Sequence, residues 1–185
     1  MATPPIIAGN WKMNLVLESS TKLISDLKKG GISKSRARVI IIPPATLLSS
    51  IADQIKNTGI FLGAQNCHEE LKGAFTGEVS AEMLASAGCN YVILGHSERR
   101  TLFGETNAQI KAKMSSAIKC GLTPIVCVGE SIRQREAGGA MDAVEVQLEE
   151  CLIDGVSKDN CIIAYEPIWA IGAGQTAEPD DICLL

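Results

Sequence analysis

Residues 91–130 read YVILGHSERRTLFGETNAQIKAKMSSAIKCGLTPIVCVGE, and they contain one repeat of a pattern that runs through the chain. The apolar runs Tyr91–Gly95 and Thr123–Val128 are rich in Ile and Val and lack polar alternation, as strands covered on both faces do. Between them, the capping box Thr106-x-x-Gln109 opens a helix that runs to about Cys120 and stops at Gly121. The stretch therefore predicts a strand, a helix and a second strand.

The same alternation extends along the whole chain. Further Ile- and Val-rich runs predict strands, and apolar residues at helical spacing predict helices between them. The additional strands are predicted at Pro5–Ala8, Arg38–Ile42, Ile60–Ala64 and Cys161–Tyr165, and the additional helices at Leu15–Lys28 and Asp142–Leu152. A repeated β-α pattern implies a parallel sheet with right-handed crossovers.

The spacing of the predicted strands bounds the architecture. Successive strands begin about 31 residues apart on average. Eight such units would need roughly 250 residues, the typical size of a (β/α)8 barrel, whereas six units in 185 residues could form a complete open sheet. Periodicity alone does not separate these architectures. No linker or low-complexity segment divides the chain, so residues 1–185 are predicted to form a single domain.

Composition excludes several classes of protein. The chain is 46% hydrophobic and 21% charged, too little charge for a disordered protein. Its net charge of −4 argues against a nucleic-acid or anionic-membrane partner, and no apolar run approaches the ~18–20 residues of a membrane span. The N-terminus has no signal-peptide pattern. The cysteines form no C-x-x-C pair and predict reduced core thiols of a cytoplasmic protein; they are Cys67, Cys89, Cys120, Cys127, Cys151, Cys161 and Cys183.

Polar residues follow four of the predicted strands. The chemistry of parallel α/β folds collects at the carboxyl ends of the strands. Lys12, His96, Cys127 and Glu166 are therefore expected to converge on one rim of the sheet. A cation, an imidazole and a carboxylate on one rim are the groups needed to abstract a proton beside a polarised carbonyl.

Each of these residues also has an ordinary structural explanation. A strand-end Lys or Glu is usually solvated or ion-paired, and His96 could simply cap a helix. Cys127 lies between apolar neighbours, so we expect it to pack rather than to form a thiol nucleophile with His96. His68 follows Cys67, but no further ligands stand at metal spacing, so no metal site is predicted.

A glycine-containing segment near the end of the sequence allows two interpretations. Gly172-Ala173-Gly174-Gln175-Thr176-Ala177 fits the dinucleotide-binding fingerprint, which would make the chain an open dinucleotide-binding domain. The match is weak, because six residues separate it from Tyr165 and Pro179 follows it. A loop that closes over an anionic substrate explains the spacing better, since glycine lets backbone amides approach a phosphate.

Five segments together are more specific than any single motif, and they span nearly the whole chain. They are Ala8-Gly9-Asn10-Trp11-Lys12-Met13-Asn14, Gly63-Ala64-Gln65-Asn66, Gly73-Ala74-Phe75-Thr76-Gly77-Glu78, Gly95-His96-Ser97-Glu98-Arg99-Arg100 and Tyr165-Glu166-Pro167-Ile168-Trp169-Ala170-Ile171-Gly172. In this order they resemble the triosephosphate isomerase family. The resemblance implies a TIM (β/α)8-barrel fold with six βα units in this chain. It also implies a glycolytic and gluconeogenic aldose–ketose isomerase that interconverts dihydroxyacetone phosphate and glyceraldehyde 3-phosphate, with no cofactor and no metal.

The resemblance implies a role for each rim residue. Glu166 would be the base that moves a proton between adjacent carbons, and His96, as a neutral imidazole, would polarise the carbonyl. Lys12 would attract the phosphate and stabilise the enediolate, with Asn10 positioning it. Glu98 would be a supporting polar residue. A carboxylate base on one side and electrophilic donors on the other are what enolisation requires.

The resemblance further implies a lid and a dimer. Gly172 would offer a backbone amide to the phosphate, and Thr76 would insert into the neighbouring subunit of a homodimer. Gln175 stands where the family usually has Lys, a difference that would alter loop kinetics rather than chemistry. The lid loop would comprise Pro167, Ile168, Trp169, Ala170, Ile171, Gly172, Ala173, Gly174, Gln175 and Thr176.

The sequence after Thr176 begins a predicted helix and stops within two turns. The last two βα units, whose loops often build the phosphate site, are therefore expected to be absent from these 185 residues. We expect turnover far below that of a complete enzyme. One alternative is a catalytically incompetent fragment or isoform that acts through dimerisation or binding. Another is a chain that a missing segment or a partner completes.

Overall fold

The computed structural model describes residues 4–32, 35–171 and 182. Six parallel strands form one sheet in the order β1-β2-β3-β4-β5-β6. The strands are β1 Ile6–Asn10, β2 Arg38–Ile42, β3 Ile60–Ala64, β4 Tyr91–Leu94, β5 Thr123–Val128 and β6 Ile162–Tyr165. All six predicted strands are confirmed. The one notable difference in bounds is that β1 continues through Gly9 and Asn10, because both residues pair with β2.

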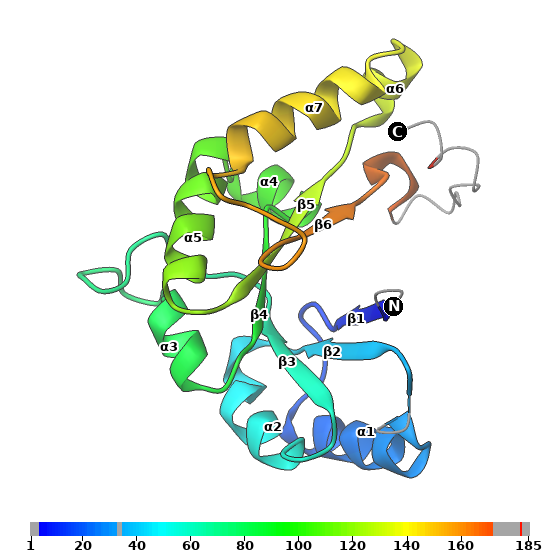
Figure 1. The fold of residues 1–185 in the computed structure, drawn as a ribbon, viewed down its shortest axis with the longest axis vertical. Helices are drawn as coiled ribbons and strands as arrows, with labels where there is room; N and C mark the ends of the chain where they lie inside the picture. Colours follow the sequence, from blue (N-terminus) through cyan, green and yellow to red (C-terminus); the bar gives the residue numbers. More distant parts are fainter. Residues whose placement is uncertain (1–3, 33–34, 172–181, 183–185) are drawn as a thin grey trace.

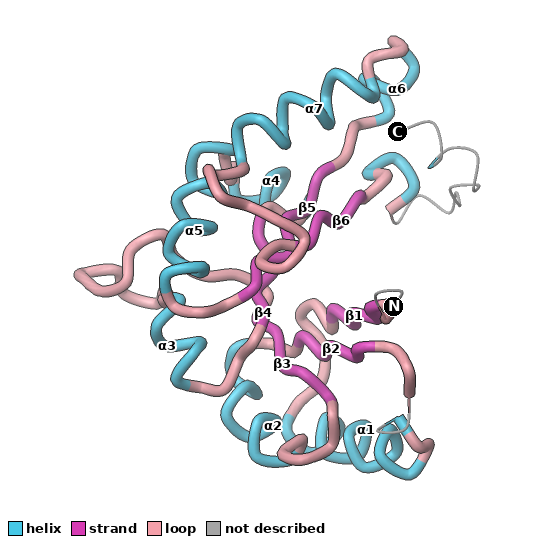
Figure 2. Tube along the Cα trace, in the orientation of Figure 1, coloured by secondary structure: helices cyan, strands magenta, loops and turns pink. Residues whose placement is uncertain are grey.

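Helices lie along the outer side of the curled sheet (Figures 1 and 2). The described helices are α1 Leu17–Lys29, η2 Ala45–Leu47, α2 Leu48–Gln54, α3 Ala81–Ser86, α4 Ser97–Phe103, α5 Asn107–Lys119, α6 Ile132–Glu136, α7 Ala140–Cys151 and η3 Ile168–Ala170. The three longer helices, α1, α5 and α7, are those that the sequence predicts, with ends displaced by at most two residues. None of the helices in the described ranges is long and apolar enough to cross a membrane.

The strand order separates the two architectures that periodicity left open. In a doubly wound sheet the order reverses at a switch point and helices cover both faces. Here each strand pairs with the next one in the sequence, and the helices lie outside the curl (Figure 1). The interpretation as an open dinucleotide-binding sheet is therefore wrong. The arrangement is that of a TIM barrel represented by six of its βα units.

Two apolar layers cover the sheet, one on each face. The outer layer lies between strands and helices and includes Ile51, Leu94 and Met114. The inner layer lies within the curl and comprises Ile40, Ile42, Tyr91, Ile93, Ile125 and Cys127. Burial on both faces explains why most strands lack polar alternation. At the two edge strands of the described sheet, Ile7 is 60% exposed and Ile163 is 43% exposed.

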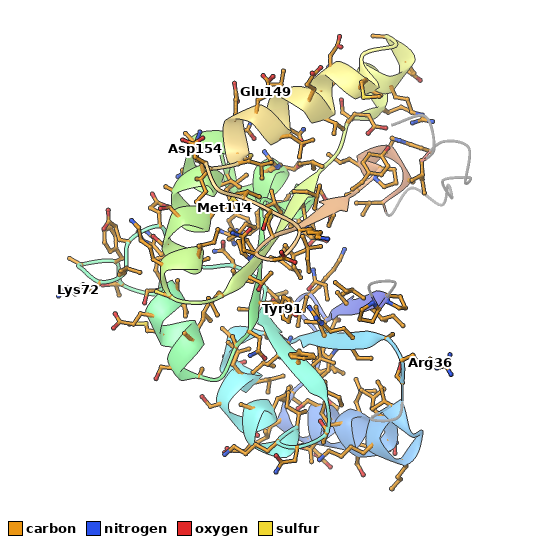
Figure 3. The ribbon with its side chains drawn as sticks, in the orientation of Figure 1. Arg36, Lys72, Tyr91, Met114, Glu149 and Asp154 are labelled. Atoms are coloured by element: carbon orange, nitrogen blue, oxygen red, sulfur yellow. The ribbon has the colours of Figure 1, made fainter. Side chains whose placement is uncertain are left out.

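The parallel register brings the carboxyl ends of the strands to one rim. Asn10 at the end of β1 pairs with Ile42 at the end of β2, and Val128 at the end of β5 pairs with Tyr165 at the end of β6. The loop of residues 65–80, between β3 and α3, projects away from the body, with Lys72 at its tip (Figure 3).

Candidate active site

His96 lies directly after β4 and is the N-cap of α4. Its ring is buried, and its Nδ1 accepts a hydrogen bond from the backbone N–H of Glu98 at 3.2 Å. A ring nitrogen that accepts a hydrogen bond carries no proton, so the neutral imidazole has its proton on Nε2. Nε2 lies 3.2 Å from Oε1 of Glu166. The helix cap thus directs the single N–H of the ring at a carboxylate.

Glu166 lies directly after β6, and hydrogen bonds hold both its backbone and its carboxylate. Its backbone N–H donates to the carbonyl of Val128 at 2.7 Å. Its Oε2 accepts from the backbone N–H of Ser97 at 3.1 Å, while Oε1 faces His96. The carboxylate therefore lies at the N-terminus of α4, where the backbone N–H groups and the helix dipole favour negative charge.

The side chain of Cys127 is part of the inner apolar layer, next to the Glu166 carboxylate. Burial raises the pKa of its thiol well above the usual range, and the neighbouring Glu166 raises it further. The thiol is therefore protonated at neutral pH. The interpretation that Cys127 packs, rather than attacking as a thiolate, is confirmed by its 3% exposure.

Lys12 follows β1 in a left-handed backbone conformation, with φ of 53°. Its backbone N–H donates to Oδ1 of Asn10 at 2.9 Å, and its carbonyl accepts from Nε2 of Gln65 at 2.7 Å. Its Nζ forms an ion pair with Oε1 of Glu98 at 2.6 Å. The hydrogen bond from Lys12 lowers the pKa of the Glu98 carboxyl. Both ends of this ion pair are partly exposed, so the cation is accessible to an anionic ligand.

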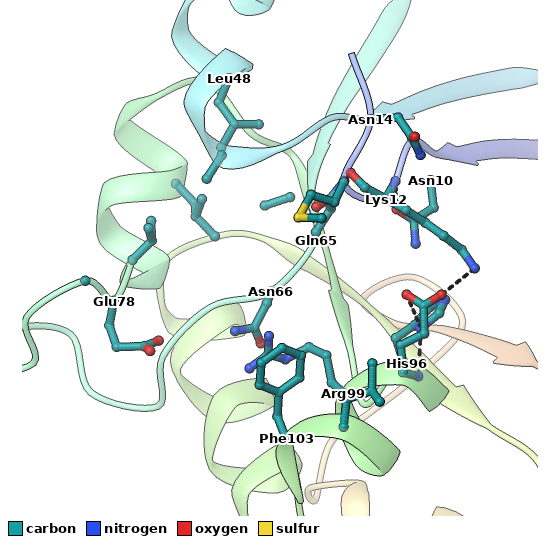
Figure 4. A pocket seen from close by; sticks show the side chains of 18 residues that line it. Asn10, Lys12, Asn14, Leu48, Gln65, Asn66, Glu78, His96, Arg99 and Phe103 are labelled. Carbon is teal, nitrogen blue, oxygen red and sulfur yellow. Dashed lines mark hydrogen bonds and ion pairs between the residues drawn. The ribbon is translucent and has the colours of Figure 1, made fainter. Parts of the chain in front are cut away.

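A cleft of about 670 Å³ extends from these side chains (Figure 4). Asn10, Lys12 and His96 lie on one side of it, and Glu78 and Phe103 line the other side. Phe103 is 70% exposed although it is a large aromatic side chain. Asn10, Lys12, His96 and Glu98 thus line a concave and partly apolar surface.

Gly129 follows β5 and lies against the backbone of Glu166. A Cβ atom at position 129 would come within 1.8 Å of the Glu166 carbonyl oxygen, so no side chain fits there. Both backbone groups of Gly129 bond the side-chain amide of Gln147 on α7 at 2.9 Å. The missing side chain lets the chain after β6 pass close to the end of β5.

The buried carboxylate of Glu130 links β5 to the segment after β6. It accepts hydrogen bonds from the hydroxyl of Tyr165 at 2.9 Å and from Nε1 of Trp169 at 2.8 Å. Arg135 donates to it at 3.2 Å and also lies over the Trp169 ring, 4.6 Å from the ring centroid. Burial and Glu130 raise the pKa of Tyr165 to about 12. These contacts hold η3 against α6.

A second buried carboxylate, Glu105, joins α4 to α5. It forms ion pairs with Lys113 and, at 3.2 Å, with Arg99. Burial acts to raise the pKa of Glu105, but the hydrogen bonds and charges of Lys113 and Arg99 outweigh it, so the pKa is lowered. The ion pairs tie α4, the helix that His96 caps, to α5.

Comparison with known proteins assigns the family. A family profile described as "Triosephosphate isomerase" matches residues 5–184. The chain belongs to the triosephosphate isomerase family. The triosephosphate isomerase of Magnetococcus marinus is 48% identical over 177 residues, which are 93% of this chain and 69% of that protein. That of Chloroflexus aurantiacus is 49% identical over 180 residues, which are 96% of this chain and 72% of that protein.

A solved structure gives the same assignment. The crystal structure of triosephosphate isomerase from Bartonella henselae is 44% identical and superposes with a TM-score of 0.84. The match covers 90% of this chain and 69% of that one. The predicted family, fold and isomerase class are therefore confirmed.

Triosephosphate isomerase site residues named from the sequence fall into three groups. Asn10, Lys12, Glu98, His96 and Glu166 lie on one rim and are linked by the contacts above. Thr76 lies exposed in the loop 65–80. Of the predicted lid, residues 167–171 are described and contain η3, whereas residues 172–176, with the glycine motif, lie outside the described residues. In the described part of the chain, no cluster of three or more His, Cys, Asp or Glu side chains could hold a metal ion.

Sequence reasoning did not assign functions to Gln65, Gly129 and Glu130. Gln65 bonds the Lys12 carbonyl across 53 residues of sequence, and Glu130 bonds Trp169 across 39 residues. Gly129 and Glu130 stand at a strand end, which marks them as candidates. Their contact partners depend on which strands become neighbours in the curled sheet, and the local sequence pattern does not reveal them.

Proposed function

We propose that this chain interconverts dihydroxyacetone phosphate and glyceraldehyde 3-phosphate at the rim formed by Lys12, His96 and Glu166. The observation that carries the proposal is the 3.2 Å contact between Oε1 of Glu166 and Nε2 of His96. It brings a carboxylate base and a neutral N–H donor to one end of a parallel sheet, where α/β enzymes have their sites. The relatives named above are triosephosphate isomerases.

In this mechanism Glu166 removes a proton from the hydroxymethyl carbon of dihydroxyacetone phosphate. The electrons of the broken C–H bond form the enediolate double bond, and the carbonyl electron pair moves to oxygen. Nε2–H of His96 hydrogen-bonds to that oxygen and can transfer its proton to it. Nε2 of His96 then takes the proton of the C1 hydroxyl, which restores the neutral ring, and Glu166 returns its proton to the adjacent carbon. The C1–O bond becomes the aldehyde carbonyl as the enediol double bond is lost. The net reaction needs no redox cofactor.

Lys12 supplies the positive charge for the phosphate and the enediolate. Its ion pair with Glu98 is short but partly exposed, with 42% and 43% of the two side chains accessible. A phosphate dianion can therefore draw Nζ away from Glu98 at low cost, since exposed ion pairs are weak. Asn10 holds the Lys12 backbone. Gly172 of the lid would add an amide donor.

The turnover of a polypeptide of these 185 residues is the direct test. Loops after strands seven and eight often hold the phosphate in such barrels, and the described sheet has six strands. We therefore expect isomerisation far slower than by the Chloroflexus aurantiacus relative in a coupled assay under identical conditions. Turnover equal to that relative would contradict this expectation. No turnover above a Glu166→Gln control would contradict the proposed reaction and favour a non-catalytic chain that acts through dimerisation.

We propose a homodimer as the assembled form. The loop 65–80, which contains Thr76, projects away from the body (Figure 3), and the cleft beside Lys12 and His96 is a concave surface that could receive such a loop. Exposed Met13, Leu102 and Phe103 supply apolar area. We expect a dimer mass in light scattering and a monomer mass for Thr76→Arg. A monomer mass for the unchanged chain would contradict the proposal.

We propose the cytoplasm as the site of action. The six described cysteines are all free thiols, and five are buried, as expected in a reducing compartment. Glycolysis and gluconeogenesis, which the family implies, supply the phosphorylated three-carbon sugar.

A further inference from the structure

Arg100 on α4 contacts the turn after β4 and three further elements, β5, α5 and α7, through one guanidinium group. Its Nε donates to the carbonyl of Gly95 at 2.8 Å, and its Nη2 donates to the carbonyl of Cys127 at 3.3 Å. Its Nη1 donates to Oδ1 of Asn107 at the start of α5, and Nη2 lies 3.5 Å from Sγ of Cys151 at the end of α7. These partners are all uncharged, and no ion pair found among the described residues includes Arg100.

The two carbonyl partners lie where the pairing of β4 with β5 ends. The last pair of that register is Leu94 with Val126. The next residues, Gly95 and Cys127, no longer pair, and the guanidinium bridges their carbonyls instead. Arg100 therefore extends the connection between β4 and β5 by one step beyond their last residue pair, while Cys127 itself remains paired with Ala164 of β6.

Each bridged residue adjoins one half of the proton-transfer pair. Gly95 immediately precedes His96 and turns the chain into α4 with φ of +70°, so its carbonyl orientation sets the entry of His96 into the helix cap. The thiol of Cys127 lies against Glu166, and the neighbouring carbonyl of Val128 accepts the Glu166 backbone N–H. The distance between the bridged carbonyls is thus linked to the distance between His96 and Glu166.

Only arginine among the basic residues can make this set of contacts. Its planar fork presents five N–H donors in a rigid geometry, whereas lysine offers a single ammonium on a flexible stem. Asn107 fixes the guanidinium plane of Arg100 by accepting from Nη1. Asn107 is itself held by Glu150, to which its Nδ2 donates at 2.7 Å. A Cβ at position 95 would meet Nη2 at 3.0 Å, so the guanidinium fills the space beneath the turn.

We propose that Arg100 is a positioning residue that sets the relative placement of His96 and Glu166. This role rests on the proposed function, because it gives Arg100 an effect on proton transfer that it exerts through these two side chains. The positive charge of Arg100 does not by itself set this placement. The placement depends on the forked guanidinium, which bridges the carbonyls of Gly95 and Cys127. A lysine at position 100 therefore cannot replace it.

The first experiment detects the tautomer of the His96 ring by NMR and does not depend on enzymatic turnover. The chain has only two histidines, so long-range 1H–15N spectra of the labelled chain give two ring patterns, and His96→Asn assigns them. We expect His96 of the unchanged chain to be the Nε2–H tautomer, and expect Arg100→Lys to replace that pattern with averaged or exchange-broadened signals. Met114→Ala on α5, which removes a buried apolar side chain but no strand-end hydrogen bond, is the destabilised control and retains the pattern.

The second arm measures deuterium uptake from D2O into dihydroxyacetone phosphate. We expect Arg100→Lys to slow uptake about tenfold to 100-fold, the loss that small misplacement of reacting groups causes, and Met114→Ala to slow it far less. An unaltered His96 pattern in Arg100→Lys, or equal slowing in both variants, would overturn the positioning role. Absence of uptake by the unchanged chain would contradict the proposed function, and the spectra would still decide the geometry.

Discussion

His96 is at once the cap of α4 and the ring that faces Glu166. From the sequence alone, a helix cap and a proton-transfer role are alternatives for His96. In the structure the cap fixes the ring proton on Nε2, so the first role is a condition for the second. Because Nδ1 accepts the Glu98 N–H, Nε2 must carry the proton of the neutral ring. The capping role of His96 therefore does not argue against its role in proton transfer.

His96→Asn separates the two functions. Asparagine is a good N-cap, so we expect the free energy of unfolding in urea to change by less than about 1 kcal/mol. Proton transfer should fall by about 100-fold to 10,000-fold, the usual contribution of general acid–base groups. His96→Ala loses the cap as well and should be less stable than His96→Asn. Equal deuterium uptake by His96→Asn and the unchanged chain would contradict the role of the imidazole.

Glu105 predicts a pH dependence of stability. Its pKa is lowered in the folded state, so the unfolded chain binds the proton more tightly. The ion pairs therefore stabilise the fold at neutral pH, and that contribution is lost as the pH falls below about 4.5 and through the folded pKa. We expect Glu105→Gln to lower the free energy of unfolding by about 3–5 kcal/mol at pH 7, because it leaves buried Lys113 without its carboxylate partner.

Urea titrations from pH 7 down to pH 3.5 measure this effect. The gap in unfolding free energy between the unchanged chain and Glu105→Gln should narrow as the pH falls. Glu149→Gln, an exposed change on the outer side of α7 (Figure 3), is the matched control and should follow the unchanged chain. A constant gap over the whole range would mean that ionisation of Glu105 does not stabilise the fold.

At the scale of elements, the close approach of β5 and β6 depends on one glycine. Gly129→Ala would force a methyl group into the Glu166 carbonyl, so the chain after β6 must move. We expect deuterium uptake to fall at least about tenfold, since the base is displaced, together with a loss of stability. Gly139→Ala is the control, because a Cβ there meets its nearest atom at an ordinary 3.6 Å. Similar uptake by both variants would show that the contact does not position Glu166.

The strands and long helices could be predicted because their signals are local. Ile- and Val-rich runs, the capping box of Thr106 and the stop at Gly121 need no tertiary information. The helices of five to seven residues, such as α3 and α4, are too short to show a period and were not predicted. The rim residues were found by their positions after strands. The contacts of Glu130 and Arg100 were not, because they depend on which strands become neighbours.

At the scale of the whole molecule, the described sheet has β1 and β6 as its edges. The chain spans about 70% of the length of the relatives it matches, from 69% to 72%. Unpaired edges with exposed apolar side chains promote association. We expect a double substitution of Ile7→Lys and Ile163→Lys to reduce concentration-dependent light scattering with little loss of stability, because neither side chain is buried.

Ile40→Lys provides the contrast to this pair of surface changes. Ile40 is completely buried in the inner layer, so the same lysine there should unfold the chain or greatly destabilise it. Unchanged scattering by the double variant would show that the edges do not drive association.

Glu166, in the proposed reaction, transfers a proton at the rim that His96 and Lys12 share. Deuterium uptake from D2O into the hydroxymethyl carbon of dihydroxyacetone phosphate, followed by proton NMR, tests it most directly because it needs only the proton-transfer step. We expect measurable uptake with the unchanged chain and with Glu149→Gln, and uptake at least about 100-fold slower with Glu166→Gln. Uptake by Glu166→Gln at the rate of the unchanged chain would contradict it.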